Sequence, residues 1–375
     1  MERKCDVIVT YCWNRVGYNI LLRLNALGLK VWAADTSKNN ICSRSRFCAG
    51  SFSYPDPFTR EDDFIRCLKE QVSALKPVML LPTHDESQVI MRHREEFPSS
   101  LVIPYMDVET LENLSDKAWA TEKARECGVP VPKVFSSWED VDIFPCVFKT
   151  VIGNSAKTVF FPKNKQELGK LVAEYDGVKV LIEERIGGTD FSVDCVRWDG
   201  FFKASTYHAL VTKTEGGGTT TQREIISCPK LERYAEILLE YVDFKGVCGL
   251  DFRFDPFNGE AAFIEMNVRF TGGIATPIAA GFDIPQVVYR LATTGHYDEP
   301  VQVKVGTKTK WILGDVILLV GRLFSLKFNR KEWAQALSFK GFDAFDDYRS
   351  DDRGAFMGEM SYYLGKLLKN GKLNP

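Results

Sequence analysis

The sequence predicts an α/β protein in which an N-terminal parallel sheet precedes a larger part of mixed α and β structure. A short β-branched run at residues 6–10 is followed by an amphipathic stretch at 16–27, a glycine and a second apolar run at 31–34. Strand, helix and strand in this order form a βαβ unit, which implies a parallel sheet with a right-handed crossover. A similar unit recurs as a helix at 64–75 and a strand at 78–82.

From residue 114 the chain predicts alternating strands and helices of an α+β type. Ser115 is expected to cap a helix that ends at Gly128. Further expected elements are strands at 146–150, 158–161, 179–184, 191–198 and 202–208, helices near 165–175, 230–241 and 284–293, and a hairpin at 249–268. Beyond residue 297 helical periodicity is weak, and no element is assigned there.

Composition excludes several classes of protein. The chain has 375 residues, of which 45% are hydrophobic and 26% are charged, with a formal net charge of −2. These proportions are typical of globular proteins, and the near-neutral charge argues against nucleic-acid binding. The N-terminus has no signal-peptide pattern, and the apolar stretch 316–320 is too short to span a bilayer. We therefore expect a cytoplasmic protein without membrane or nucleic-acid partners.

The cysteines do not predict a disulfide framework or a zinc site. Ten cysteines occur without a Cys-x-x-Cys pair, and the chain has only four histidines. Several cysteines stand in apolar runs, such as 145–148 and 247–250, and are expected in the core. The turn at residues 10–17 has one glycine where a dinucleotide fingerprint needs three, which excludes NAD binding there.

The hairpin at 249–268 carries the strongest chemical signal. Residues 250–255 and 263–269 both alternate between apolar and polar side chains, and counting from the turn places Asp251 opposite Glu265. Two facing carboxylates repel one another and require a cation or a proton between them. With the amide of Asn267 they form a set of oxygen ligands suited to Mg²⁺. The alternative is the solvated outer face of an ordinary hairpin.

The stretch 263–269, following 249–252, resembles the metal-binding end of the ATP-grasp enzymes. That superfamily includes biotin carboxylase, D-alanine–D-alanine ligase and the large subunit of carbamoyl-phosphate synthase, and the resemblance extends over residues 7–294. It implies an N-terminal parallel-sheet (pre-ATP-grasp) domain followed by a two-lobed ATP-grasp fold. The domains implied are 1–110, 111–300 with a lid subdomain at about 115–185, and a C-terminal extension of unknown role at 301–375.

The resemblance also implies the residues that hold ATP and metal. Asp251, Glu265 and Asn267 would bind two Mg²⁺ ions, a role that Mn²⁺ can also fill. Lys149 matches the phosphate-binding lysine of the family and, with Arg269, is assigned a catalytic role in stabilising transferred charge. Lys117 matches a second basic position that reaches the phosphates in relatives.

Residues 180–186 resemble the adenine-binding strand and linker. The backbone groups of Glu184 and Ile186 would pair with the adenine ring, Asp190 would accept from the ribose hydroxyls, and Glu183 would lie near the adenine amine. The lid loop at 150–158 departs from the family because it has one glycine, so Lys157 is expected to supply charge there instead.

The glycine-rich loop at 213–221 lies where the family places substrate or acyl-phosphate contacts. Consecutive glycines let backbone N–H groups approach an anion, although a mobile surface loop has the same composition. His208 and Arg223 flank this loop and are candidate substrate contacts.

The function implied is that of an ATP-dependent ligase. It would activate a small-molecule carboxylate as an acyl-phosphate, join it to an amine or another nucleophile, and release ADP and phosphate. The stretch 267–273 looks most like the carbamoyl-phosphate-synthase-like members, and the chain length suits a stand-alone relative. A biotin-carboxylase-like enzyme that activates bicarbonate and a non-catalytic nucleotide-binding protein are the alternatives, and a homodimer is compatible with either.

Overall fold

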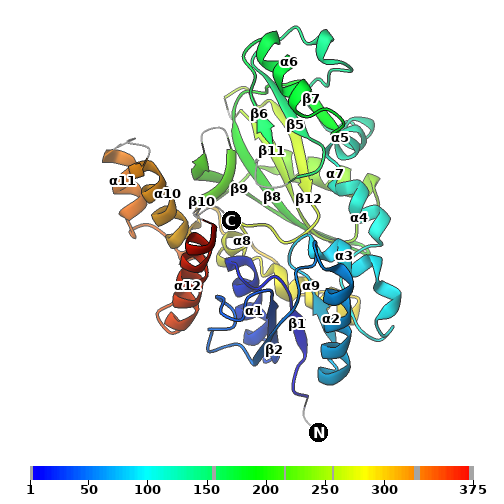
Figure 1. The fold of residues 1–375 in the computed structure, drawn as a ribbon, viewed down its shortest axis with the longest axis vertical. Helices are drawn as coiled ribbons and strands as arrows, with labels where there is room; N and C mark the ends of the chain where they lie inside the picture. Colours follow the sequence, from blue (N-terminus) through cyan, green and yellow to red (C-terminus); the bar gives the residue numbers. More distant parts are fainter. Residues whose placement is uncertain (1–2, 154–157, 215–216, 256, 325–329, 371–375) are drawn as a thin grey trace.

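Three β-sheets organise the computed structural model. The structure describes residues 3–153, 158–214, 217–255, 257–324 and 330–370. Within these residues the sheets have four, seven and three strands. In Figure 1 the four-stranded sheet lies at the base, the three-stranded sheet lies at the opposite end, and the seven-stranded sheet runs between them.

The four-stranded sheet confirms the predicted parallel arrangement. Its strands are β1 (Val7–Val9), β2 (Val31–Asp35), β3 (Gly50–Ser53) and β4 (Met79–Leu81). Their order is β3-β2-β1-β4, and each pairing is parallel. The accompanying helices are α1 (Arg15–Ala26), α2 (Glu61–Leu75) and α3 (Glu86–Arg92), with a 3₁₀ turn at Arg94–Glu96. The carboxyl ends of β1 and β4 lie side by side, so the residues after both strands share one edge.

The seven-stranded sheet holds the predicted hairpin. Its strands are β8 (Thr189–Trp198), β9 (Phe201–Thr214), β10 (Gly217–Ile226), β11 (Gly246–Phe254), β12 (Ala261–Asn267), β13 (Lys308–Lys310) and β14 (Ala344–Phe345). They follow the order β12-β11-β8-β9-β10-β13-β14. Helices α7 (Pro229–Tyr241) and α9 (Ile284–Thr294) pack against this sheet, and α9 also contacts α1. The sheet takes strands from both sides of residue 300, and the domain boundaries proposed above stay predictions.

The three-stranded sheet forms a separate small lobe, uppermost in Figure 1. Its strands are β5 (Cys146–Thr150), β6 (Val159–Phe160) and β7 (Val180–Glu184), in the antiparallel order β6-β5-β7. The lobe also contains helix α6 (Lys165–Glu174) and a 3₁₀ turn at Trp138–Asp140. Phe148, Leu168 and Ile182 form its core. This sheet therefore holds Lys149 on a buried strand.

The expected Ser115 helix cap is wrong. Ser115 ends helix α4 (Val108–Ser115), and Asp116 is the N-cap of α5 (Lys117–Glu126). The Asp116 side chain accepts hydrogen bonds from the backbone N–H groups of Ala118 and Trp119. Ser115 instead donates its hydroxyl to Leu111 O at 2.7 Å. Because Asp and Ser are both preferred N-caps, the adjacent pair gave two valid starting points.

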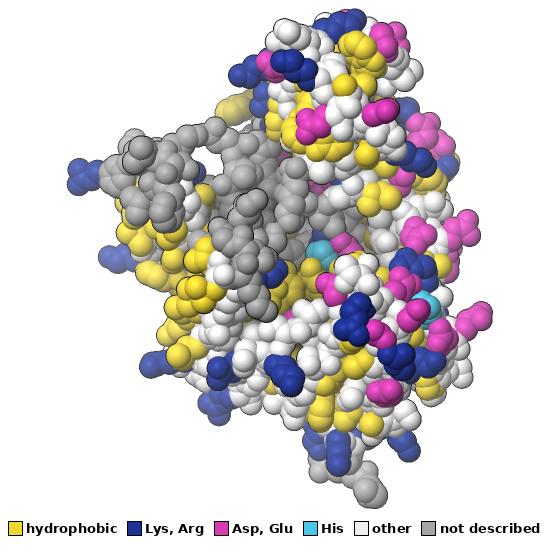
Figure 2. Space-filling view, in the orientation of Figure 1, with side chains coloured by type: hydrophobic (Ala, Val, Ile, Leu, Met, Phe, Trp, Pro, Cys, Tyr) yellow, Lys and Arg dark blue, Asp and Glu magenta, His cyan; other side chains and the backbone are white. Residues whose placement is uncertain are grey.

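The C-terminal segment is more ordered than its weak periodicity indicated. It contributes helices α10 (Ile312–Phe324), α11 (Arg330–Leu337) and α12 (Arg353–Asn370) in addition to β13 and β14, and a short helix α8 (Ala275–Ala279) precedes it. Figure 2 shows hydrophobic side chains gathered over α10 and α12. No helix in the described ranges is both long and apolar enough to cross a membrane.

A buried ion network ties this segment to the rest of the chain. Asp346 accepts from Arg15 Nε at 3.1 Å and pairs with Arg223 as well. Arg15 opens α1, Arg223 belongs to β10, and the Asp346 side chain is fully buried. One carboxylate thus joins three parts of the chain that are far apart in sequence.

We predict that Asp346→Asn destabilises the protein strongly, because two buried guanidinium groups lose their counter-ion. Breaking a buried ion pair costs about 3–5 kcal/mol, measured here as the free energy of unfolding in urea. The exposed pair Arg233–Glu236 supplies the control, and Glu236→Gln should change that free energy by less than about 1 kcal/mol. Equal, small effects of the two substitutions would contradict this account.

Candidate active site

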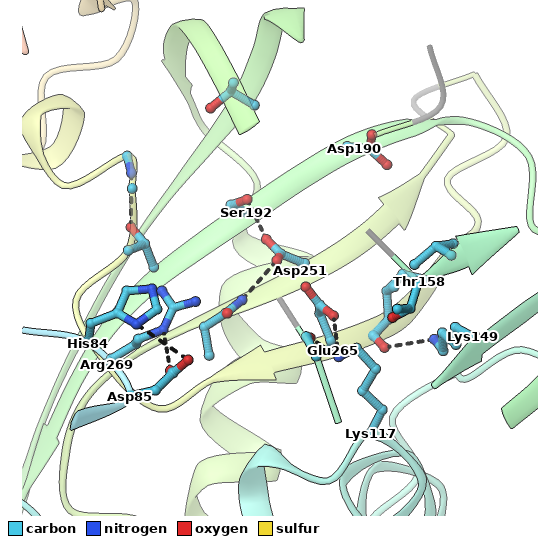
Figure 3. A pocket seen from close by; sticks show the side chains of 18 of the residues that line it. His84, Asp85, Lys117, Lys149, Thr158, Asp190, Ser192, Asp251, Glu265 and Arg269 are labelled. Atoms are coloured by element: carbon cyan, nitrogen blue, oxygen red, sulfur yellow. Dashed lines mark hydrogen bonds and ion pairs between the residues drawn. The ribbon is translucent and has the colours of Figure 1, made fainter. Parts of the chain in front are cut away.

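One cavity of about 570 Å³ gathers every residue that the sequence assigned to the site. It is lined by residues of all three sheets and of the C-terminal segment. The assigned residues that line it are Lys117, Lys149, Glu183, Glu184, Ile186, Asp190, Asp251, Glu265, Asn267 and Arg269. In Figure 3, Asp251 and Glu265 lie between Lys149 at one end and Arg269 at the other.

The predicted pairing of Asp251 with Glu265 is confirmed by the register of β11 and β12. Asp251 accepts from Ser192 Oγ at 2.5 Å and from Asn267 Nδ2 at 3.1 Å. Lys117 Nζ lies 3.3 Å from Glu265 Oε2. Burial, followed by the charge of Glu265, raises the pKa of Asp251 to about 7. The hairpin therefore concentrates negative charge that a neighbouring cation stabilises.

This set of side chains fits a metal that is shared with a ligand. Among the described residues, no group of three or more His, Cys, Asp and Glu side chains is placed to hold a metal ion. Asp251, Glu265 and Asn267 supply two carboxylates and an amide, which is fewer than a complete protein cage requires. Mg²⁺ at nucleotide sites uses one or two carboxylates and completes its shell with phosphates and water. The residues thus suit Mg²⁺ bound together with phosphate.

Lys149 lies in a buried ion pair. It projects from β5, and its Nζ lies 2.6 Å from Glu183 Oε1 on the neighbouring strand β7. It also donates to Ile264 O at 3.3 Å. Within the described structure, the second oxygen of Glu183 is buried without a hydrogen-bond partner. Burial raises the pKa of Glu183, and an additional donor from a ligand would satisfy this oxygen.

The residues assigned to adenine and ribose follow the same strand. Strand β7 ends at Glu184, whose side chain accepts from the backbone N–H of Lys133 at 2.9 Å. Ile186 lies beyond the strand end and lines the cavity. Asp190 pairs with Arg253 at 2.6 Å across β8 and β11. Sequence reasoning missed Arg253 because its contact with Asp190 depends on two strands pairing across 63 positions.

Arg269 forms the other end of the cavity with residues from the N-terminal sheet. Strand β12 stops at Asn267, so Arg269 follows the strand and donates its backbone N–H to Asn267 O. Its Nε lies 3.0 Å from Asp85 Oδ1. Burial, followed by the charge of Arg269, lowers the pKa of His84 to about 3 and keeps this imidazole neutral. Figure 3 shows His84, Asp85 and Arg269 as one group.

Comparison with known proteins identifies the middle of this chain. Residues 176–314 match a family model described as "ATP-grasp in the biosynthetic pathway with Ter operon". The chain contains an ATP-grasp domain. This domain includes the β11–β12 hairpin, whereas Lys117, Lys149 and the N-terminal sheet precede the matched residues.

A curated relative and two solved structures resemble the ATP-grasp chain more widely. The relative is D-alanine–D-alanine ligase from Fusobacterium nucleatum, which is 26% identical over 162 residues, or 40% of this chain. The match covers 55% of the relative, so the chain spans about half the length of the curated protein that it matches. The alignment therefore leaves much of each protein unmatched.

Biotin carboxylase from Campylobacter jejuni, solved as a β,γ-ATP complex, has a TM-score of 0.67 at 15% identity. That alignment covers 81% of this chain and 74% of the other. The ADP complex of N5-carboxyaminoimidazole ribonucleotide synthetase has a TM-score of 0.67 at 14% identity, over 86% and 87% of the two chains. At these identities the two structures establish the fold alone.

Other sequence predictions are only partly described by the structure. Residues 154–157, which include Lys157 of the lid loop, and residues 215–216 of the glycine-rich loop lie outside the described residues. His208 and Arg223 do not line the cavity. His208 lies 3.4 Å from Glu224, whereas Arg223 belongs to the buried network of Asp346. The structure therefore places neither of them where a substrate contact was expected.

Glu86 is a buried carboxyl group that the sequence did not single out. It accepts from Thr10 Oγ1 at 2.6 Å and from the backbone N–H of Thr83 at 3.0 Å, and so joins the ends of β1 and β4. Burial raises the pKa of Glu86 from 4.5 to about 7. The folded protein thus retains a proton that the unfolded chain releases.

We predict that Glu86→Gln alters the dependence of stability on pH. In the native protein Glu86 favours folding at low pH, and this contribution falls as the pH rises from about 4.5 to 7. The variant should gain on the native protein by about 1.4 kcal/mol per pH unit over this range and not above it. Urea unfolding at several pH values measures the difference, and the exposed Glu95→Gln is the control. Parallel pH profiles of the native protein and Glu86→Gln would refute the assignment.

Proposed function

We propose that the protein is an ATP-dependent, ADP-forming ligase that activates a small carboxylate and joins it to an amine. The observation that supports this most is the convergence of Lys149, Lys117 and the Asp251–Glu265 pair on one cavity. Cations and metal-binding carboxylates in a single cleft are what a triphosphate requires. The ATP-grasp domain and the similarity to D-alanine–D-alanine ligase favour a ligase among nucleotide-binding enzymes.

ATP would lie along the cavity with its adenine at the β7 end. The proposed contacts are the backbone groups of Glu184 and Ile186 for the ring and Asp190 for the ribose. The unpartnered oxygen of Glu183 would accept from the adenine amine. Lys149 and Lys117 would bind the phosphates as point charges.

Mg²⁺ bound by Asp251, Glu265 and Asn267 would neutralise phosphate charge and orient the γ-phosphoryl group. Asn267 and Ser192 donate to Asp251 and fix the direction of its oxygens. Lys117 offsets the charge of Glu265 at 3.3 Å and would reach the phosphates when the carboxylate turns to the metal. The chain thus positions both carboxylates before any ligand binds.

The chemistry proceeds in two steps. A carboxylate oxygen of the first substrate attacks the γ-phosphorus, the bond to the β,γ-bridging oxygen breaks, and ADP leaves with that electron pair. The amine nitrogen of the second substrate then attacks the acyl carbon, and phosphate leaves as the amide forms and the nitrogen loses its proton. Arg269, held at 3.0 Å by Asp85, would stabilise charge on the transferred phosphoryl group and the tetrahedral intermediate.

The function is tested with pools of organic acids, amino acids and amines. ADP release is followed in the presence of Mg²⁺, and the products are identified by mass spectrometry. ADP release that requires an acid and an amine, together with the amide mass, supports the ligase. ADP release that requires bicarbonate alone indicates a carboxylase, and bound nucleotide without turnover for any pair indicates a non-catalytic protein.

We predict that Glu265→Gln abolishes the Mg²⁺ dependence of ATP binding while the fold is retained. Loss of one carboxylate ligand should weaken Mg²⁺-dependent binding by roughly 100-fold, the upper range for outer-shell partners. Calorimetric titration of ATP with and without Mg²⁺ measures this effect. Glu260→Gln removes an exposed carboxylate near the turn of the same hairpin and is the matched control. If Glu265→Gln binds MgATP as the native protein does, the hairpin is not the metal site.

We predict that Lys149→Met weakens ATP binding by about 10- to 100-fold, the value of one charge-assisted contact. The single substitution also leaves Glu183 buried without its counter-ion. The double variant Lys149→Met with Glu183→Gln removes both charges and separates lost binding from lost stability. The exposed Lys179→Met is the control. Native ATP affinity in a folded double variant would remove Lys149 from the nucleotide site.

A further inference from the structure

The end of the cavity beyond Arg269 carries a second set of side chains that the proposed nucleotide site does not use. It is lined by four aromatic residues and one arginine, which we call the aromatic end: Tyr11, Trp13, Arg15, Trp311 and Tyr363. The first three come from the N-terminal sheet and the start of α1, and the last two come from the C-terminal segment. Tyr363 lies outside the residues matched by the ATP-grasp model.

The rings of the aromatic end form a continuous wall. The centroids of Tyr11 and Trp13 lie 5.6 Å apart, those of Trp13 and Tyr363 lie 6.2 Å apart, and those of Trp311 and Tyr363 lie 6.3 Å apart. Trp13 also stacks on Tyr362 at 5.1 Å, which holds it from behind. Rings at these separations favour edge-to-face or offset contact with a further aromatic group.

Tyr11 adopts a backbone conformation that favours glycine. Its φ angle is +58°, in the left-handed region that large side chains rarely occupy. Its backbone N–H donates to Tyr54 Oη at 2.9 Å, and its ring stacks on His84 at 4.5 Å. Backbone strain of this kind concentrates at ligand sites. The chain thus keeps a strained tyrosine at the edge where the carboxyl ends of β1 and β4 meet, which is where α/β sheets bind ligands.

Arg15 supplies the charge of the aromatic end. Its guanidinium carbon lies 3.9 Å from the centroid of Trp311, and its Nε donates to the buried Asp346. Stacking and this ion pair fix the plane of the guanidinium group, and its terminal nitrogens face the turn at Gly272. A Cβ atom on Gly272 would lie 3.1 Å from Arg15 Nη2. A ligand over this turn would therefore meet a rigid, oriented cation.

The same turn links the aromatic end to the metal-binding hairpin. Asn267 ends β12, Arg269 follows it, and Gly272 and Gly273 complete the turn. Gly273 lies so close to Tyr207 that a Cβ atom would approach the tyrosine oxygen to 2.3 Å. Arg269 and Arg15 thus stand at the two ends of one short turn beside the proposed γ-phosphate position.

We propose, on the basis of the ligase function above, that the aromatic end selects as its acid substrate a carboxylic acid that carries an aromatic ring. The ring would pack against Tyr11, Trp13 and Tyr363, and the carboxylate would lie over the Gly272–Gly273 turn between Arg15 and Arg269. This places one carboxylate oxygen next to the γ-phosphate. The C-terminal segment thereby becomes part of the specificity pocket, which gives a role to residues that the sequence left unassigned.

The experiment uses the full-length protein and three small probes: 3-phenylpropionate, propionate and 3-phenylpropionamide. Binding of each is measured by calorimetry with and without Mg²⁺ and a non-hydrolysable ATP analogue. We expect 3-phenylpropionate to bind at least about tenfold more tightly than propionate, which lacks the ring, and than the amide, which lacks the charge. Equal affinities for 3-phenylpropionate and propionate would overturn the proposal.

Two variants separate the ring contact from the charge contact. Tyr11→Gly removes a ring and relieves the positive φ, so the melting temperature should be maintained or raised while the preference for the phenyl group is lost. Arg15→Met should abolish the preference for the acid over the amide, and Tyr11→Gly decides the matter if Arg15→Met folds poorly. Tyr241→Leu, an exposed tyrosine on α7, is the matched control. A Tyr11→Gly variant that keeps the phenyl preference contradicts the proposal.

The same titrations distinguish failure of this inference from failure of the proposed function. Nucleotide binding without any preference for the aromatic acid overturns the inference and leaves the ligase proposal intact. Preference for the aromatic acid without nucleotide binding supports the aromatic end and overturns the ligase proposal.

Discussion

The site depends on two carboxylates that face each other across a β ladder. Asp251 and Glu265 occupy paired positions on β11 and β12, where like charges destabilise a sheet unless something compensates them. Ser192 and Asn267 donate to Asp251, and Lys117 lies beside Glu265. Each of these partners comes from a different element, so the repulsion is relieved only when the lobes assemble. The pair therefore links the metal site to the tertiary structure.

The sequence could predict what strand periodicity and local turns determine. Alternation along 250–255 and 263–269 placed Asp251 opposite Glu265, and the strand at 146–150 placed Lys149, both of which the structure confirms. Ser192, Arg253, His84 and Asp85 could not be found in this way. Their roles arise from strands that pair, or edges that meet, after long stretches of intervening chain.

The C-terminal segment shows why weak periodicity need not mean weak structure. Asp346 is buried because Arg15 and Arg223 surround it, and Trp311 is buried under Arg15 and hydrogen-bonded to Glu359. Polar residues that are buried through distant partners disrupt the apolar pattern on which sequence reasoning depends. The same contacts bring Trp311 and Tyr363 to the cavity, so one network both anchors the segment and shapes the substrate end.

The central claim is that Asp251 and Glu265 bind a divalent ion together with the phosphates of ATP. Crystals grown with Mn²⁺ and a non-hydrolysable ATP analogue test it directly, because Mn²⁺ scatters anomalously and replaces Mg²⁺ at oxygen sites. The account predicts an anomalous peak between the two carboxylates, with the γ-phosphate of the analogue on its opposite side. Nucleotide bound in the cavity with no ion between Asp251 and Glu265, or nucleotide bound elsewhere, would contradict it.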